Sequence, residues 1–352
     1  MTTSTKRLHP LGTHRVLEPE GAMPQAALRV DNTPVCYANE ILCDVETLNI
    51  DSASFKQISD AENGDAERIA AHITQIISQR GKQHNPVTGS GGMFIGRVRE
   101  IGATLAENIA LQPGDRIASL VSLTLTPLHL ERIERIDVAT GRVWVKAQAV
   151  LFSRSLWAKL PTDIDENVAL AVLDVAGAPA QVKRLCQPGQ TVVVIGADGK
   201  SGMLSCAQAK TRVGPAGRVL GIVPSLDTPS AKLLIDGGYV DALLCCDARN
   251  ALACSDDVLA ELPEGADLTI NCVNVPGTEL ASILMTKDHG TVYFFSMSTS
   301  FTAAALGAEG VAKDITMIVG NGYAVDHAEI ALQTLRDHAP IRRYFESKYA
   351  SK

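Results

Sequence analysis

The chain has 352 residues, of which 46% are hydrophobic and 20% charged, which is typical of a globular protein with two domains. Its net charge of −7 argues against a nucleic acid or an anionic membrane as a partner. No stretch approaches the roughly 18 apolar residues of a membrane span, and the first residues lack the apolar segment of a secretory signal. The eight cysteines form no C-x-x-C pair. We therefore expect a cytoplasmic protein with free, mostly buried thiols.

Residues 1–155 are predicted to form a strand-rich domain. Short strands are expected at 40–49, 96–101, 116–125 and 141–150, separated by glycines and prolines. One helix is predicted over residues 65–80, because Ile69, Ile73, Ile76 and Ile77 share a face and Gly81 can end it. The pattern predicts a small, partly open β-barrel with a helical insertion near residues 60–81.

Strands and helices alternate after residue 156. A helix is predicted over 163–185, and strands are predicted at 191–195, 218–223, 242–246, 267–273, 291–295 and 315–319. Six strands joined by crossovers predict a doubly wound α/β sheet in the order 3-2-1-4-5-6. This second domain is expected to span residues 156–322. Residues 323–352 are predicted to be helical with a break near Pro340, and to pack back on the first domain.

The sequence TVVVIGADGKSG (191–202) opens that sheet. A β-branched strand runs into glycines spaced G-x-x-G-x-x-G, followed by a helix predicted over 203–210. Such glycines let the backbone approach a pyrophosphate, and the helix N-terminus offers free N–H groups. The pattern predicts a dinucleotide site. Its candidate residues, at the loop and at the carboxyl ends of the next strands, are Gly196, Gly199, Lys200, Ser201, Gly202, Ser225, Asp247, Ala248, Val273, Asn274, Ser296 and Met297.

The residues themselves do not choose between NAD and NADP. An NAD site usually has an acidic residue at the end of the second strand, where it binds the ribose. Here that strand ends in Pro224-Ser225, and the nearest acid, Asp227, lies further along. No arginine marks a 2′-phosphate site at this position either.

Several longer segments carry a family resemblance. NPVTGSGGMFIGRVREIG (85–102) and LQPGDRIASL (111–120) resemble the medium-chain dehydrogenase/reductase superfamily. GTHRVLEP (12–19), LDVAGAPAQ (173–181) and IVGNGY (318–323), with other segments along essentially the whole chain, resemble its L-erythro-3,5-diaminohexanoate dehydrogenase family. The resemblance implies a GroES-like first domain, a Rossmann second domain and NAD as cofactor, with NADP as the alternative. It also implies oxidative deamination of (3S,5S)-3,5-diaminohexanoate to 5-amino-3-oxohexanoate and ammonia, a reaction of lysine fermentation.

Many members of the superfamily use zinc, but this chain is expected to hold no metal. No cysteine lies between Cys43 and Cys186, so a structural zinc lobe has no ligands. Gly92 stands where the superfamily's G-H-E motif has its histidine, and Asp51 and Asp174 stand at the positions of ligand cysteines. Two isolated carboxylates make a poor zinc site.

Those two aspartates suit a substrate with two ammonium groups. Hydride can leave the carbon only after its ammonium group has lost a proton, so a base is needed. The hypothesis is that one of Asp51 and Asp174 deprotonates the reacting amine while the other holds the second ammonium group. Ser52 can orient water or the amine, and Arg15 is a candidate partner of the substrate carboxylate. The structural alternatives are helix or turn caps for the aspartates and a surface salt bridge for Arg15.

Two other functions remain open. A zinc-free quinone or enone reductase of the same superfamily predicts an uncharged, apolar pocket. A non-catalytic NAD(P)-binding sensor predicts cofactor binding without turnover, because the fold alone does not determine function. The apolar strand segments TVYFF and ITMIVG make a homodimer the expected assembly.

Overall fold

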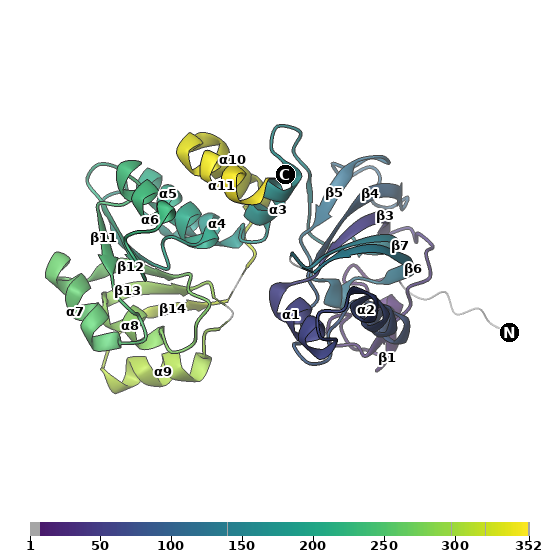
Figure 1. The fold of residues 1–352 in the computed structure, drawn as a ribbon, viewed down its shortest axis with the longest axis horizontal. Helices are drawn as coiled ribbons and strands as arrows, with labels where there is room; N and C mark the ends of the chain where they lie inside the picture. Colours follow the sequence, from purple (N-terminus) through teal and green to yellow (C-terminus); the bar gives the residue numbers. More distant parts are fainter. Residues whose placement is uncertain (1–7, 139, 297, 321, 351–352) are drawn as a thin grey trace. The chain divides into compact units, whose positions relative to one another are not determined.

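The structure is a computed structural model that describes residues 8–138, 140–296, 298–320 and 322–350, without the side chains of residues 52 and 53. The chain divides into two compact units, Met1–Leu160 and Pro161–Lys352. Figure 1 shows the first unit dominated by antiparallel strands and the second by alternating strands and helices.

The first unit is built on a six-stranded antiparallel sheet in the order β6-β7-β3-β4-β5-β8. Its strands are β3 (Glu40–Asn49), β4 (Met93–Ile101), β5 (Arg116–Ser119), β6 (Leu128–Asp137), β7 (Arg142–Phe152) and β8 (Trp157–Lys159). A short turn, η1 (Thr13–Arg15), leads into a separate two-stranded ribbon of β1 (Val16–Glu18) and β2 (Arg29–Val30). Because β6 and β8 are the two edges of the sheet, the barrel-like unit is partly open.

Several of its strands differ from the sequence prediction. The strand predicted over 116–125 is too long: β5 ends at Ser119, and Ser122 caps the short helix η2 (Leu123–Leu125) by accepting a hydrogen bond from the Thr124 amide at 3.3 Å. Strand β6 was not predicted. Its sequence, LHLERIERID, is half-exposed and rich in charged side chains, which obscure the alternation of a strand.

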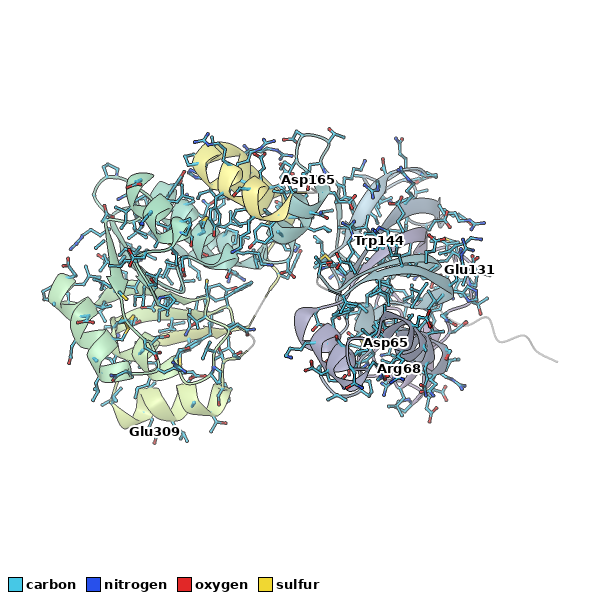
Figure 2. The ribbon with its side chains drawn as sticks, in the orientation of Figure 1. Asp65, Arg68, Glu131, Trp144, Asp165 and Glu309 are labelled. Atoms are coloured by element: carbon cyan, nitrogen blue, oxygen red, sulfur yellow. A yellow bond between two sulfur atoms is a disulfide. The ribbon has the colours of Figure 1, made fainter. Side chains whose placement is uncertain are left out.

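Helix α2 (Ala66–Arg80) matches the predicted insertion. The Asp65 side chain caps its start by accepting hydrogen bonds from the amides of Glu67 and Arg68, and Figure 2 labels both Asp65 and Arg68. Gly81 ends the helix at φ +70°, and a Cβ there would collide with the Val30 carbonyl oxygen. The four isoleucines of α2 are buried in the core of the sheet. A second helix, α1 (Ser52–Ala61), precedes α2 and was not predicted.

The second unit contains a six-stranded parallel sheet in the order β11-β10-β9-β12-β13-β14. Its strands are β9 (Thr191–Ile195), β10 (Arg218–Val223), β11 (Ala242–Cys245), β12 (Ala266–Asn271), β13 (Thr286–Phe294) and β14 (Thr316–Val319). Numbered within this unit, the order is 3-2-1-4-5-6, which confirms the predicted topology. Strand β9 is therefore central, and the glycine loop follows it at the point where the strand order reverses.

Helices cover both faces of this sheet, as Figure 1 shows for α5 and α6 on one side and α8 and α9 on the other. The helices are α3 (Glu166–Leu173), α4 (Gly177–Leu185), α5 (Lys200–Val213), α6 (Pro229–Asp236), α7 (Ala251–Glu261), α8 (Glu279–Leu284), α9 (Phe301–Gly310), α10 (His327–Asp337) and α11 (Ala339–Tyr349). Within this unit α10 packs on α3 and α4, and α11 packs on α3 and α6.

The helix predicted over 163–185 is two helices. In a continuous helix Pro179 would remove the hydrogen bond to the Val175 carbonyl and clash with it. Here α4 begins at Gly177, so Pro179 lies in its first turn, where the amide needs no partner within the helix. The break places Asp174 at the end of α3.

Among the described residues, no helix has the length and apolar character needed to cross a membrane. The antiparallel unit and the doubly wound parallel unit are the GroES-like and Rossmann architectures expected from the sequence.

Candidate active site

The glycine loop is shaped to approach a ligand closely. Gly196 adopts φ +76°, which other residues rarely tolerate. A Cβ on Gly202 would collide with the Gly196 carbonyl oxygen, whereas Gly199 has ordinary clearance. Helix α5 then starts at Lys200 without a side-chain cap, unlike α6, whose Thr228 hydroxyl accepts from the Ala231 amide. The start of α5 therefore offers uncapped N–H groups to an anion.

Beside this loop lies a cavity of about 540 Å³ at the carboxyl ends of β9, β10, β11 and β12. Its walls include Gly196, Pro224, Asp247, Ala248 and Val273, four of which are predicted cofactor residues. A cavity at this edge of a doubly wound sheet is where dinucleotides bind, so the residues present fit that ligand.

Arg249 also lines the cavity and was missed by sequence reasoning. Its guanidinium donates to both carboxylate oxygens of Asp247, at 2.7 to 3.1 Å. These hydrogen bonds lower the pKa of Asp247 to about 2. No local motif signals Arg249, because it follows the third strand rather than the second.

The other predicted cofactor residues lie near the same strand ends. Asn274 Oδ1 accepts hydrogen bonds from the hydroxyls of Ser296 and Ser298, at 3.4 and 2.7 Å. The Ser225 hydroxyl accepts from the Asp227 amide at 3.3 Å. Ser201 is buried in the first turn of α5. Met297 lies outside the described residues.

A disulfide at this cavity corrects the expectation that all cysteines are free. Cys246, which lines the cavity, forms a disulfide with Cys254 of α7, with 5.5 Å between their Cα atoms. Cys245 lines the cavity as well and is free and exposed. This pair could not be predicted, because its separation of eight residues matches no common motif.

The fold brings Asp174 and Lys200 together, although we predicted separate roles for them from the sequence. Lys200 Nζ lies 2.6 Å from Asp174 Oδ2. The side chain of Lys200 is 32% exposed and that of Asp174 is 48% exposed, so both remain within reach of a ligand. The pair joins the end of α3 to the start of α5 at the glycine loop.

Asp51 belongs to the first unit, at the start of α1. One carboxylate oxygen, Oδ1, caps the helix by accepting from the Ser54 amide at 3.0 Å. The other, Oδ2, is buried and has no hydrogen-bond partner. A buried carboxylate oxygen without a partner is costly in a purely structural residue, so capping alone does not account for Asp51.

Further polar groups lie in this region of the first unit. Ser52 is the first residue of α1, but its side chain lies outside those that the structure describes. The Ser54 hydroxyl lies 2.6 Å from that of Thr88 and 2.7 Å from that of Ser90. Gln83 is fully buried, and both polar atoms of its amide lack partners. Sequence reasoning missed Thr88, Ser90 and Gln83, because nothing in the local sequence marks them.

Arg15 is a structural residue, which corrects the expectation of a substrate ligand. Its side chain is fully buried, so the surface salt bridge is also excluded. Nε and Nη2 donate to the Glu40 carboxylate at 2.9 and 2.6 Å, and the other N–H groups reach the carbonyls of Asp31, Thr33 and Val35. All five donors are used, and none is left for a substrate carboxylate.

Among the described residues, no three or more His, Cys, Asp or Glu side chains are grouped so as to hold a metal ion. The described residues thus offer a cavity beside the glycine loop and an Asp174–Lys200 pair on the second unit, and the Asp51 carboxylate on the first.

Comparison with known proteins identifies the family. Residues 14–161 match the model of the L-erythro-3,5-diaminohexanoate dehydrogenase N-terminal domain. A protein of Acetoanaerobium sticklandii named L-erythro-3,5-diaminohexanoate dehydrogenase is 52% identical over 96% of this chain and 98% of its own. A protein of Fusobacterium nucleatum with the same name is 50% identical, with the same coverage.

Among solved structures, a mycobacterial quinone oxidoreductase shares the fold with a TM-score of 0.52 and 18% identity, covering 91% of this chain and 84% of its own. The CurK enoyl reductase gives the same TM-score and coverage at 13% identity. The solved structures thus support the two-part fold, and the sequence relatives match both parts of it. The chain belongs to the L-erythro-3,5-diaminohexanoate dehydrogenase family.

Proposed function

We propose that the protein oxidises L-erythro-3,5-diaminohexanoate to 5-amino-3-oxohexanoate and ammonia, with a nicotinamide dinucleotide as hydride acceptor. The observation that carries the proposal is identity of at least 50% with two dehydrogenases of that name along nearly the whole chain. The quinone and enoyl reductases resemble the chain at under 20% identity, which supports no shared activity.

The reaction needs a base at the reacting amine. The substrate arrives as an ammonium ion, and a carboxylate that takes one of its protons leaves a neutral amine whose lone pair assists hydride departure from the adjacent carbon. The resulting iminium ion adds water, and the adduct expels ammonia to give the ketone. Asp51 suits the role of base, because its Oδ2 is not engaged by any hydrogen bond while Oδ1 caps α1.

Asp174 suits the second ammonium group. Its present partner is itself an ammonium group, that of Lys200, at 2.6 Å. A substrate ammonium group can take the same place at the same carboxylate.

When bound, the dinucleotide supplies the hydride acceptor. The glycine loop, the uncapped start of α5 and the cavity beside them are the elements that would hold it. We propose NAD rather than NADP. Arg249, the arginine at the cavity, is engaged by Asp247, and the Asp198 carboxylate lies against Thr228 at the start of α6. Both carboxylates would oppose a 2′-phosphate.

The test supplies NAD or NADP with 3,5-diaminohexanoate and follows the reduced cofactor by its absorbance. We expect reduction of NAD and at least about tenfold slower reduction of NADP. Absence of reduction with both cofactors would contradict the proposed function, and a preference for NADP would contradict only the cofactor assignment.

A further inference from the structure

The ion pair between Asp174 and Lys200 connects two parts of the second unit that have different tasks in the proposed reaction. Asp174 ends α3, and Lys200 is the first residue of α5, directly after the glycine loop. Their charged atoms are 2.6 Å apart. One side chain of the pair therefore belongs to the phosphate-binding element and the other to the proposed ammonium site.

Lys200 stands at the unfavourable end of its helix. A helix N-terminus carries partial positive charge and disfavours a lysine, and Lys200 is the first residue of α5. Helices α2 and α3 follow the ordinary rule, because Asp65 and Asp165 cap their starts. The placement of Lys200 therefore works against the stability of α5 and is explained better by an anion that interacts with it.

The pair is also open to exchange. Both side chains are partly exposed, and ion pairs of this kind add little to stability. A pyrophosphate at the start of α5 would present negative charge beside Lys200 and compete with Asp174 for its ammonium group.

We propose that Lys200 couples the two binding events: in the free protein it occupies Asp174, and a bound dinucleotide draws it to the pyrophosphate and frees Asp174 for the substrate ammonium group. This inference rests on the proposed function. Coupling of this kind is reciprocal, so the amine substrate raises the affinity for the dinucleotide by the same factor.

The experiment measures the affinity of 3,5-diaminohexanoate by calorimetry, without dinucleotide and with saturating NADH, which cannot accept a hydride. In the wild type we expect NADH to raise the affinity about tenfold or more. In Lys200→Met, Asp174 is free at all times. Substrate affinity without dinucleotide should therefore rise, the effect of NADH should fall to about twofold or less, and NADH itself should bind more weakly.

Matched variants separate this effect from a structural one. Lys210→Met removes another lysine of α5, which pairs with Asp241 at the far end of the helix, and should keep the wild-type coupling. Lys200→Arg keeps the charge and should restore most of it. In Asp174→Asn the substrate should bind weakly with and without NADH. A merely structural Lys200 would not make substrate binding to the free protein tighter when it is removed.

Two outcomes overturn the inference. One is an equal effect of NADH in the wild type and in Lys200→Met, while the wild type still reduces NAD with diaminohexanoate; the proposed function then stands alone. The other is a wild type that forms no reduced cofactor with diaminohexanoate, in which case the proposed function and the inference fail together.

Discussion

Asp51 uses its two carboxylate oxygens differently. Oδ1 caps α1 through the Ser54 amide, and Oδ2 is buried without a partner. Asparagine is as good a helix cap as aspartate, but it cannot accept a proton at neutral pH. Replacement by asparagine therefore removes the proposed base while keeping the cap.

We expect Asp51→Asn to lower kcat by about 10²- to 10⁴-fold, the usual contribution of general base catalysis. The affinity for NAD and the midpoint of thermal unfolding should hardly change. Asp65→Asn at the start of α2 is the matched control, because it alters a cap without a proposed chemical role and should leave kcat unchanged. Normal turnover in Asp51→Asn would rule out Asp51 as the base.

Arg15 and Glu40 form a fully buried pair, and His14 adds a third member, with Nε2 2.8 Å from Glu40 Oε1. Glu40→Gln would leave the Arg15 guanidinium buried without its counter-charge. We expect a loss of about 3 to 5 kcal/mol in the free energy of unfolding, measured by urea denaturation. Lys56→Ala, which breaks the exposed pair with Asp60, should cost at most about 1 kcal/mol. Equal small losses in the two variants would contradict the structural assignment of Arg15.

The same pair predicts a pH dependence. Burial alone would raise the pKa of Glu40, but hydrogen bonds from His14, Arg15 and the Tyr37 amide lower it overall from its ordinary value of 4.5. The unfolded chain therefore takes up the proton first as pH falls. The stabilisation is fully present above pH 4.5 and is lost below it. Urea denaturation of Glu40→Gln should lack this acid-dependent part.

At the scale of single elements, two glycines of the glycine loop differ in the space around them. A Cβ on Gly202 would collide with the Gly196 carbonyl oxygen, whereas a Cβ on Gly199 would have ordinary clearance in the absence of a ligand. Gly202→Ala should distort the loop, lower stability and weaken NAD binding more than tenfold. Gly199→Ala should fold with wild-type stability. Any loss of NAD affinity in this variant would come from contact between the new methyl group and the pyrophosphate.

Calorimetric titration with NAD and thermal unfolding of both variants check this expectation. Wild-type NAD affinity in a folded Gly202→Ala variant would contradict the assignment of the loop to the cofactor.

Elements with strong local signals could be predicted from the sequence. The apolar strands of the second unit and their crossovers were sufficient for the strand order, and the isoleucine face of α2 with its Gly81 cap was sufficient for that helix. The prediction failed where a local signal was overlooked or obscured. Pro179 divides the helix predicted over 163–185, and β6 carries too many charges to read as a strand.

In the candidate site, too, some features could be predicted from the sequence and others could not. Glycine spacing and strand ends predicted a dinucleotide site at the sheet edge where the structure has a cavity, because these are properties of neighbouring residues. The pairing of Asp174 with Lys200, of Arg15 with Glu40 and of Cys246 with Cys254 depends on how distant segments meet in space. No pattern in the sequence encodes such contacts directly.

At the scale of the whole molecule, a homodimer is the assembly we propose. Strand β14 is an edge of the parallel sheet, and its sequence TMIV is apolar with little protection from pairing. Light scattering should give twice the 37.4 kDa of one chain. Val319→Lys, which places a charge on the half-exposed end of this strand, should shift the protein towards monomer. A wild-type protein that is monomeric at micromolar concentration would contradict the proposal.

The central claim is that the whole chain performs an oxidative deamination, which links two products in a fixed ratio. The most direct test incubates the protein with NAD and L-erythro-3,5-diaminohexanoate and measures reduced cofactor and ammonia in the same sample. We predict that the two appear in equal amounts and at the same rate, and that neither appears without the amine. Reduced cofactor without ammonia, or neither product, would contradict the account.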